Sequence, residues 1–126
     1  MSTIKGYFKF NLPFVKIKLY GMREELAQEF EALIDTGSNS HIIVPFDRGL
    51  PLGLTLMGYA PTATASPVTD FIMLCEGNAV IGEETINTGV NVNFGTYTII
   101  GNQFLKQLNR DLHIDFANDI VELRDK

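Results

Sequence analysis

The chain has 126 residues, of which 45% are hydrophobic and 20% charged, with a formal net charge of −5 at pH 7. This length predicts a single domain over residues 1–126. The acidic balance argues against a nucleic-acid partner, because no basic cluster is present to neutralise phosphates. The longest apolar runs fall far short of a bilayer span, so we expect no membrane partner.

The first part of the chain predicts β-strands. Apolar and polar residues alternate over 8–12 and again over 15–19, and Pro13 between them marks an edge or a bend. Residues 22–34 are ambiguous. The composition of their first half favours a helix, whereas apolar residues alternate in the second half as they do in a strand.

The next stretch places one carboxylate between two strands. The apolar run 32–34 leads into Asp35, and Thr36 and Gly37 follow as a tight turn in which glycine permits a close approach of backbone or ligand. Residues 41–44 are β-branched and apolar again, which predicts a second strand. A charge at such a position is costly unless hydrogen bonds or a partner compensate it.

The middle of the chain predicts a loop and a hairpin. Residues 45–54 contain two prolines and two glycines and predict a loop. Two apolar segments, 54–57 and 68–74, predict strands that flank a run of small residues, 58–67, bracketed by prolines. Gly77-Asn78 then predicts a turn.

The last part of the chain predicts further strands and one helix. The β segments are 79–82, 86–92, 97–100, 112–116 and 120–123, the last two forming a hairpin around a turn at 117–119. Between them, residues 101–108 predict the best helix of the chain. Asn102 is its expected N-cap, and Phe104, Leu105 and Leu108 share one face. Gly101 is expected to be a packing glycine.

Two motifs carry a resemblance to a known family. Asp35-Thr36-Gly37-Ser38 after aliphatic residues, with Ile99-Ile100-Gly101 later in the chain, resembles the retropepsin-like aspartic proteases, single-lobed relatives of pepsin. The resemblance extends roughly from Val15 to Leu123. It implies a mainly all-β, closed β-barrel-like acid-protease fold with one short C-terminal helix and a flap hairpin around 58–67. It also implies a strand, not a helix, running into Asp35. A polar turn that closes an ordinary β-hairpin is the alternative interpretation of the motif.

The chemistry that the resemblance implies is peptide hydrolysis by an aspartic endopeptidase. Two carboxylates share one proton; the ionised one activates a water, and the protonated one donates to the carbonyl oxygen. The other aspartates of this chain lack the apolar setting before Thr-Gly, so the second carboxylate has to come from a second chain. We therefore expect a symmetric homodimer with Asp35 of each subunit at the two-fold axis.

The resemblance also implies roles for individual residues. Asp35 acts as acid and base, Thr36 braces the paired turns across the axis, and Gly37 offers its backbone to the bound peptide or protein substrate. The expected substrate-binding residues are Ser38, Asn39, Tyr59, Thr62, Ala63 and Thr64. The tip of the expected flap departs from the family pattern, because it contains Thr, Ala and Ser and no glycine. The chain ends, 2–5 and 120–123, are candidates for strands that pair between subunits.

Other chemistries find little support. The two histidines, His41 and His113, have no Cys or Glu at metal-ligand spacing, so we expect no metal site and no cofactor. Cys75 stands alone and is expected to be a core residue, which fits a cytoplasmic or otherwise reducing compartment, and no leader pattern opens the chain. Two further alternatives stay open: a catalytically silent peptide-binding or assembly module with the same fold, and an autonomous copy of a domain that processes a polyprotein.

Overall fold

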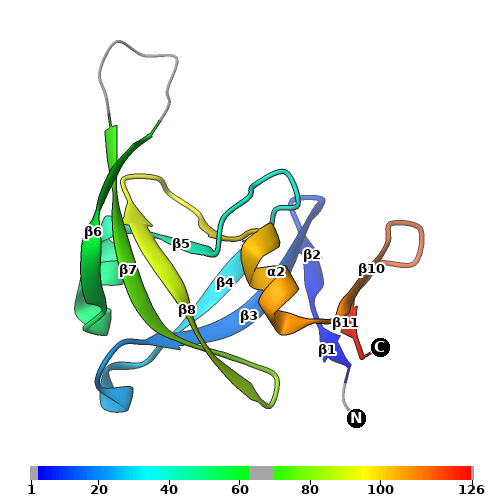
Figure 1. Cartoon of the computed structure of the whole chain (residues 1–126). Coiled ribbons are helices and arrows are strands. Elements are labelled where there is room, and N and C mark those ends of the chain that lie inside the picture. The colour runs from blue at the N-terminus through cyan, green and yellow to red at the C-terminus, as the bar shows by residue number, and fades with distance from the viewer. Residues whose placement is uncertain (1–2, 63–69, 126) are drawn as a thin grey trace.

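A computed structural model describes residues 3–62 and 70–125 of the chain. The strands are β1 (Ile4–Lys5), β2 (Tyr7–Lys9), β3 (Leu12–Tyr20), β4 (Gln28–Ile34), β5 (Ile42–Pro45), β6 (Thr55–Thr62), β7 (Asp70–Ile81), β8 (Glu84–Asn93), β9 (Thr98–Ile100), β10 (Asp111–Asp115) and β11 (Ile120–Arg124). The helical segments are α1 (Phe46–Gly49), α2 (Asn102–Leu108) and two short 3₁₀ turns, η1 (Glu24–Leu26) and η2 (Leu50–Leu52). The fold is mainly β, as expected (Figure 1).

The large sheet closes into a barrel. Its strand order is β2-β3-β4-β9-β5-β8-β7-β6, and an additional pairing of β3 with β7 joins the two sides. This pairing makes a closed ring of the strands β3, β4, β9, β5, β8 and β7, while β2 and β6 extend it at the edges. Figure 1 shows β6 and β7 rising together away from the barrel. The expectation of a closed β-barrel is confirmed.

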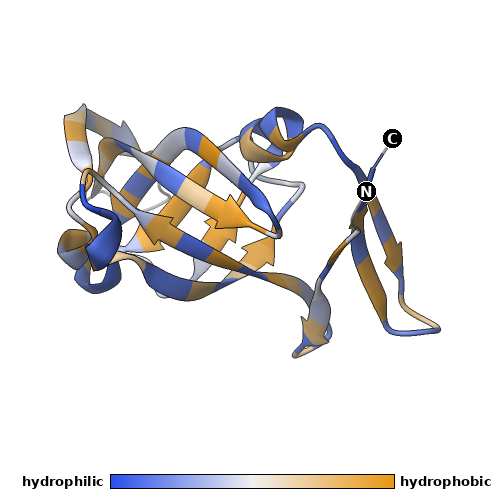
Figure 2. Ribbon diagram, turned by 90° about the horizontal axis from the view of Figure 1, so that it is seen from below, coloured by the Kyte–Doolittle hydropathy of each residue, from blue (hydrophilic) through white to orange (hydrophobic). Residues whose placement is uncertain are grey.

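Burial explains why the ambiguous segment 22–34 forms a strand. Phe30, Ala32 and Ile34 of β4 are buried, whereas Glu29 and Glu31 are exposed and Leu33 is partly buried, which is the two-residue period of a strand. Figure 2 shows the resulting bands of apolar and polar residues along the strands. Burying a large apolar side chain contributes about 1.5–3 kcal/mol, far more than the helix propensity of a few glutamates. That propensity produces only the 3₁₀ turn at 24–26.

The first hairpin turns earlier than the sequence predicts. Phe10 and Asn11 both have positive φ, 55° and 61°, and connect β2 to β3 as a two-residue turn. Pro13 therefore does not mark a bend between two strands; it lies inside β3, opposite Phe8. Backbone twist in such turns matches that of the flanking strands, and asparagine tolerates the left-handed conformation.

The predicted turn at Gly77-Asn78 is wrong. β7 runs through both residues without a break, and the chain turns instead after β7, where Gly82 has φ 58°. A Cβ atom at Gly77 would lie 2.7 Å from Leu54 Cδ2 and 2.9 Å from the Tyr20 carbonyl oxygen. Glycine is therefore present at this position because the strand packs closely against its neighbours, not because the chain reverses.

Two other expectations for the middle of the chain need correction. The predicted loop 45–54 contains the single α-helical turn α1 and the 3₁₀ turn η2. Of the expected run of small residues 58–67, residues 58–62 belong to β6, which pairs with β7 up to Thr62 and Asp70. Residues 63–69 lie outside the described part of the chain.

The chain ends form a small second sheet of order β1-β11-β10, seen beside the barrel in Figure 2. Within this one chain, Ile4 pairs with Leu123 and Lys5 with Glu122, and β10 occupies the other side of β11. Pairing of the chain ends between subunits stays a prediction. Ser2 lies outside the described residues. Among the described residues, no helix has the length and apolar character that crossing a bilayer requires.

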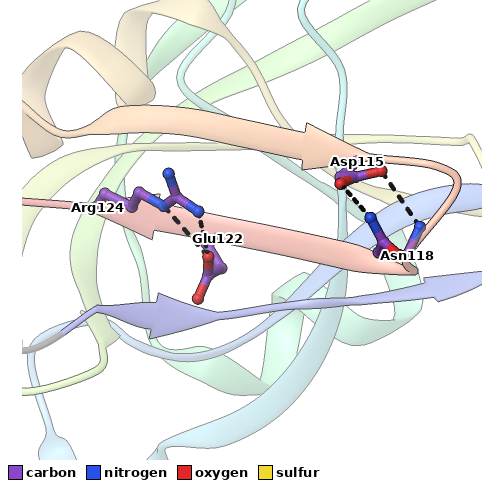
Figure 3. Close-up of polar contacts among 4 residues, drawn as sticks. All are labelled: Asp115, Asn118, Glu122 and Arg124. Carbon is purple, nitrogen blue, oxygen red and sulfur yellow. Dashed lines mark hydrogen bonds and ion pairs between the residues drawn. The ribbon is translucent and has the colours of Figure 1, made fainter.

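The predicted terminal hairpin and its turn are confirmed. The Asp115 carboxylate accepts hydrogen bonds from the Asn118 side chain at 2.8 Å and from the backbone amides of Asn118 and Ala117 at 3.2 and 3.0 Å (Figure 3). These donors, the Asn118 side chain foremost, hold the pKa of Asp115 below its ordinary value. On β11, Arg124 donates to Glu122 at 2.8 Å.

Candidate active site

The segment that carries Asp35 spans the end of a central strand. β9 lies between β4, which runs parallel to it, and β5, which runs antiparallel to it. The chain therefore leaves β4, crosses the end of β9 in the loop 35–41 and returns on β5. The two ends of this loop are fixed to β9 and the glycine after it. The Asp35 amide donates to the Ile100 carbonyl at 3.0 Å, and the Gly101 amide to the His41 carbonyl at 2.9 Å.

Asp35 is held by its own turn and stays accessible. One carboxylate oxygen, Oδ1, accepts a hydrogen bond from the Gly37 amide at 3.0 Å, and the Asp35 carbonyl accepts one from the Ser38 amide at 3.1 Å. The Asp35 side chain is half-buried, whereas Thr36 and Gly37 are exposed. The carboxylate is thus neither sealed in the core nor fully in solvent, and it can act as a proton acceptor or donor for a group placed above the turn.

The first residues of α2 bind the same loop through their backbone. The Asn102 amide donates to the Ser38 carbonyl and the Gln103 amide to the Ser40 carbonyl, both at 2.9 Å. The amides at the start of a helix have no partner inside the helix and are available for such contacts. The loop carbonyls therefore cap this helix.

The side chains of the same two residues add a second set of contacts. Asn102 Nδ2 donates to the Thr36 carbonyl at 2.8 Å, and Gln103 Nε2 donates to the Asn39 carbonyl at 3.1 Å. The prediction of Asn102 as the N-cap is wrong, since Gly101 occupies that position and no side-chain cap is formed. The sequence pattern does not predict that either amide side chain holds the Asp35 loop. The available signal was two amide donors directly after the Ile99-Ile100-Gly101 motif.

Gly101 is a packing glycine, as predicted. A Cβ atom there would lie 2.3 Å from Ser40 Oγ, 2.6 Å from the Ser40 carbonyl oxygen and 2.8 Å from the Ser38 carbonyl oxygen. The hydrophobic face of α2 is also as predicted, with Phe104 and Leu108 buried and Leu105 packed against the core. The helix is anchored by this face while its start contacts the loop.

The structure brings some of the predicted site residues together and leaves others apart. Residues 35–39 share the loop; within it, the Ser38 hydroxyl is hydrogen-bonded to the Ser40 hydroxyl at 2.8 Å, and Asn39 is exposed. Tyr59 is 62% exposed and lies on β6, in the separate β6–β7 hairpin, and Thr62 is the last residue of that strand. The predicted site residues Ala63 and Thr64 lie outside the described residues.

A separate groove lies elsewhere on the barrel. It has a volume of about 470 Å³ and is lined by residues that include Lys9, Phe10, Glu31 and Tyr97, but none from the loop 35–41. Its Glu31 carboxylate is paired with Lys9 at 3.2 Å and also accepts from the Tyr7 hydroxyl. Within the described residues, no group of three or more His, Cys, Asp or Glu side chains is placed to hold a metal ion.

Of the comparisons with known proteins, the one with solved structures agrees with this architecture. No protein-family model and no curated protein sequence matches the chain. Among solved structures, the EIAV protease complexed with the inhibitor HBY-793 superposes with a TM-score of 0.66 at 15% sequence identity, covering 85% of this chain and 97% of that one. At this identity the likeness shows a shared fold and nothing more. The chain therefore has a retropepsin-like fold.

Proposed function

We propose that the protein is an aspartic endopeptidase that is active as a symmetric homodimer. The observation that carries the proposal is the Asp35 carboxylate, half-buried at an exposed Thr36-Gly37 turn of a retropepsin-like fold. The similar solved structure, EIAV protease, is a protease complexed with an inhibitor, and this supports a protease activity for the present chain. One chain supplies one carboxylate in this setting, so a second chain is needed to complete the pair.

The mechanism follows from placing the two Asp35 side chains in contact. Two neighbouring carboxylates cannot both ionise cheaply, so the pair holds one proton between them. The ionised carboxylate deprotonates a water, which attacks the peptide carbonyl, and the protonated one donates to the carbonyl oxygen. Thr36 braces the two turns across the axis, and the exposed backbone of Gly37 is available to the bound peptide.

The proposed substrate is an extended peptide or protein segment. Ser38 and Asn39 lie directly after the catalytic turn, and in this proposal their polar groups contact the substrate backbone. The β6–β7 hairpin acts as the flap in this proposal, and its contributing residues are Tyr59, Thr62, Ala63 and Thr64. The exposed ring of Tyr59 favours apolar side chains near the cleaved bond.

The decisive variant is Asp35→Asn, which keeps the shape of the side chain and removes the acid–base group. Peptidase activity against a peptide library at mildly acid pH is expected to fall to background, with the circular dichroism spectrum and the melting temperature close to wild type. Asp47→Asn is the matched control, because it changes an exposed carboxylate on α1 outside the loop. Activity that survives in Asp35→Asn would exclude this proposal.

The homodimer is tested separately by dilution. Solution mass and specific activity are measured over a concentration series, and both are expected to fall together as the dimer dissociates. A monomer with full specific activity would contradict the shared site. A stable dimer that binds peptides without cleaving them would instead support a catalytically silent binding module with the same fold.

A further inference from the structure

One peptide unit next to the carboxylate is held at both of its ends. Its carbonyl, that of Thr36, accepts a hydrogen bond from Asn102 Nδ2 at 2.8 Å. Its amide, that of Gly37, donates to Asp35 Oδ1 at 3.0 Å. Because a peptide unit is planar and rigid, fixing the direction of its carbonyl also fixes the direction of its N–H. The Asn102 side chain is therefore connected to the Asp35 carboxylate through a single rigid group.

We propose that Asn102 is a positioning residue for Asp35, acting through the Thr36–Gly37 peptide unit; this rests on the proposed function. The turn itself is exposed, so solvent competes for both of its polar ends. Without Asn102, the Thr36 carbonyl is free to turn toward water, and the Gly37 amide turns away from the carboxylate with it. The carboxylate then loses a fixed donor and its orientation toward the reacting water.

Asn102 is suited to this role because it contacts the loop at two points. Its backbone amide donates to the Ser38 carbonyl at 2.9 Å while its side chain donates to the Thr36 carbonyl. Two anchors on one residue define the direction of the side chain and leave little freedom to the peptide unit between them. The residue itself is fixed at the start of α2, whose Phe104 is fully buried.

Gln103 supplies a matched comparison within the same helix turn. It makes an analogous pair of contacts, from its backbone amide to the Ser40 carbonyl at 2.9 Å and from its side chain to the Asn39 carbonyl at 3.1 Å. The peptide unit that it binds through its side chain does not donate to Asp35. Gln103 therefore braces the loop without acting on the carboxylate.

The informative variants are Asn102→Asp and Asn102→Ala, with Gln103→Glu as the control. Aspartate is close to asparagine in size and is favourable in the first turn of a helix, but it cannot donate to the Thr36 carbonyl when ionised. Gln103→Glu adds the same charge one residue further on. A role of Asn102 in helix stability alone predicts that Asn102→Asp behaves like wild type, and a pure charge effect predicts that Asn102→Asp and Gln103→Glu behave alike.

Two measurements report the positioning. The first is the pH titration of the Gly37 amide proton shift by NMR, which senses ionisation of the carboxylate that it binds. Its amplitude is expected to fall by about half or more in both Asn102 variants and to persist in Gln103→Glu. The second is peptide hydrolysis, in which kcat is expected to fall about 10- to 100-fold in both Asn102 variants while KM and the dimer mass stay unchanged.

The outcomes separate this inference from the proposed function. If the wild-type chain hydrolyses no peptide, the proposed function fails whatever the variants show, and the Gly37 titration still decides whether Asn102 orients the turn. If the wild type is active and both Asn102 variants keep its kcat and its Gly37 titration, the positioning role is overturned. Equal losses in Asn102→Asp and Gln103→Glu would overturn it as well, because they would reflect charge or general loosening of the loop.

Discussion

Replacing Gly101 with alanine tests how tightly the Asp35 loop is packed against the start of α2. The added Cβ would lie 2.6 Å from the Ser40 carbonyl oxygen and 2.8 Å from the Ser38 carbonyl oxygen, and 2.3 Å from Ser40 Oγ. The hydroxyl can rotate away, but the two carbonyls are backbone groups. Gly101 has φ −104°, which alanine adopts freely, so the cost is one of crowding and not of backbone strain.

The size of the effect follows from what has to move. Overpacking by one methyl group in a well-packed site costs about 1–3 kcal/mol. Here the two carbonyls cannot withdraw without lengthening the 2.9 Å hydrogen bonds that they accept from Asn102 and Gln103, each with a net contribution of about 1 kcal/mol. We therefore expect Gly101→Ala to lower the free energy of unfolding by about 2–4 kcal/mol, a large part of the 5–15 kcal/mol typical of a domain.

The assay is urea-induced unfolding followed by circular dichroism, with Gly37→Ala as the matched control. At Gly37, the nearest atom to an added Cβ is Asp35 Oδ1 at 3.2 Å, and the residue is exposed. Gly37→Ala is therefore expected to stay within about 0.5 kcal/mol of wild type in unfolding free energy, while impairing peptide hydrolysis at the turn. If Gly101→Ala is as stable as Gly37→Ala, the loop is not held in the close packing described above.

Two further predictions concern charges away from the loop. Arg110, whose side chain is only 8% exposed, contacts Glu84 at 3.0 Å and Asp125 at 2.8 Å. Arg110→Met is expected to lower the free energy of unfolding, measured by urea titration, by about 1–3 kcal/mol. An unchanged midpoint of unfolding would contradict a structural role of these ion pairs. The pKa of Glu31 lies below its ordinary value, chiefly because the Tyr7 hydroxyl donates to the carboxylate. The resulting stabilisation is present above the ordinary pKa and lost as the pH falls through the lowered one, so the stability advantage of wild type over Glu31→Gln should shrink as the pH falls below the ordinary pKa of a glutamate. A pH-independent difference would exclude this origin.

Much of the barrel is predictable because burial repeats along the strands. In β4 the alternation of Phe30, Ala32 and Ile34 competes with a helix-favouring composition just before it, and the alternation prevails because these side chains fill the core. The same reasoning identifies the helix 102–108 from its apolar face. Sequence patterns that indicate which side chains are buried predict the structure correctly, because burial contributes more free energy than local helix or strand propensity.

Residues whose role depends on a distant partner are not predictable in this way. Gly77 carries the composition of a turn, yet its function is to let β7 approach Leu54 and the Tyr20 carbonyl. Asn102 is a good N-cap by residue type, but its carboxamide binds the Thr36 carbonyl, 66 residues away in the chain. Local preference gives the same prediction whether or not such a partner exists, and only the closed barrel brings the two segments together.

The geometry of Asp35 is accordingly a property of the barrel and not of the Asp-Thr-Gly motif alone. Within the motif, the turn is held by the contacts of Gly37 and Ser38 with Asp35. The hydrogen bonds described above that join the loop to the rest of the chain come from residues 100–103, so these contacts exist only where the last third of the chain packs beside β4. A chain with the same motif but without this brace would present a carboxylate on a loose surface turn. This is why a short motif is weak evidence for catalysis by itself and becomes informative once β9 and α2 are seen to hold it.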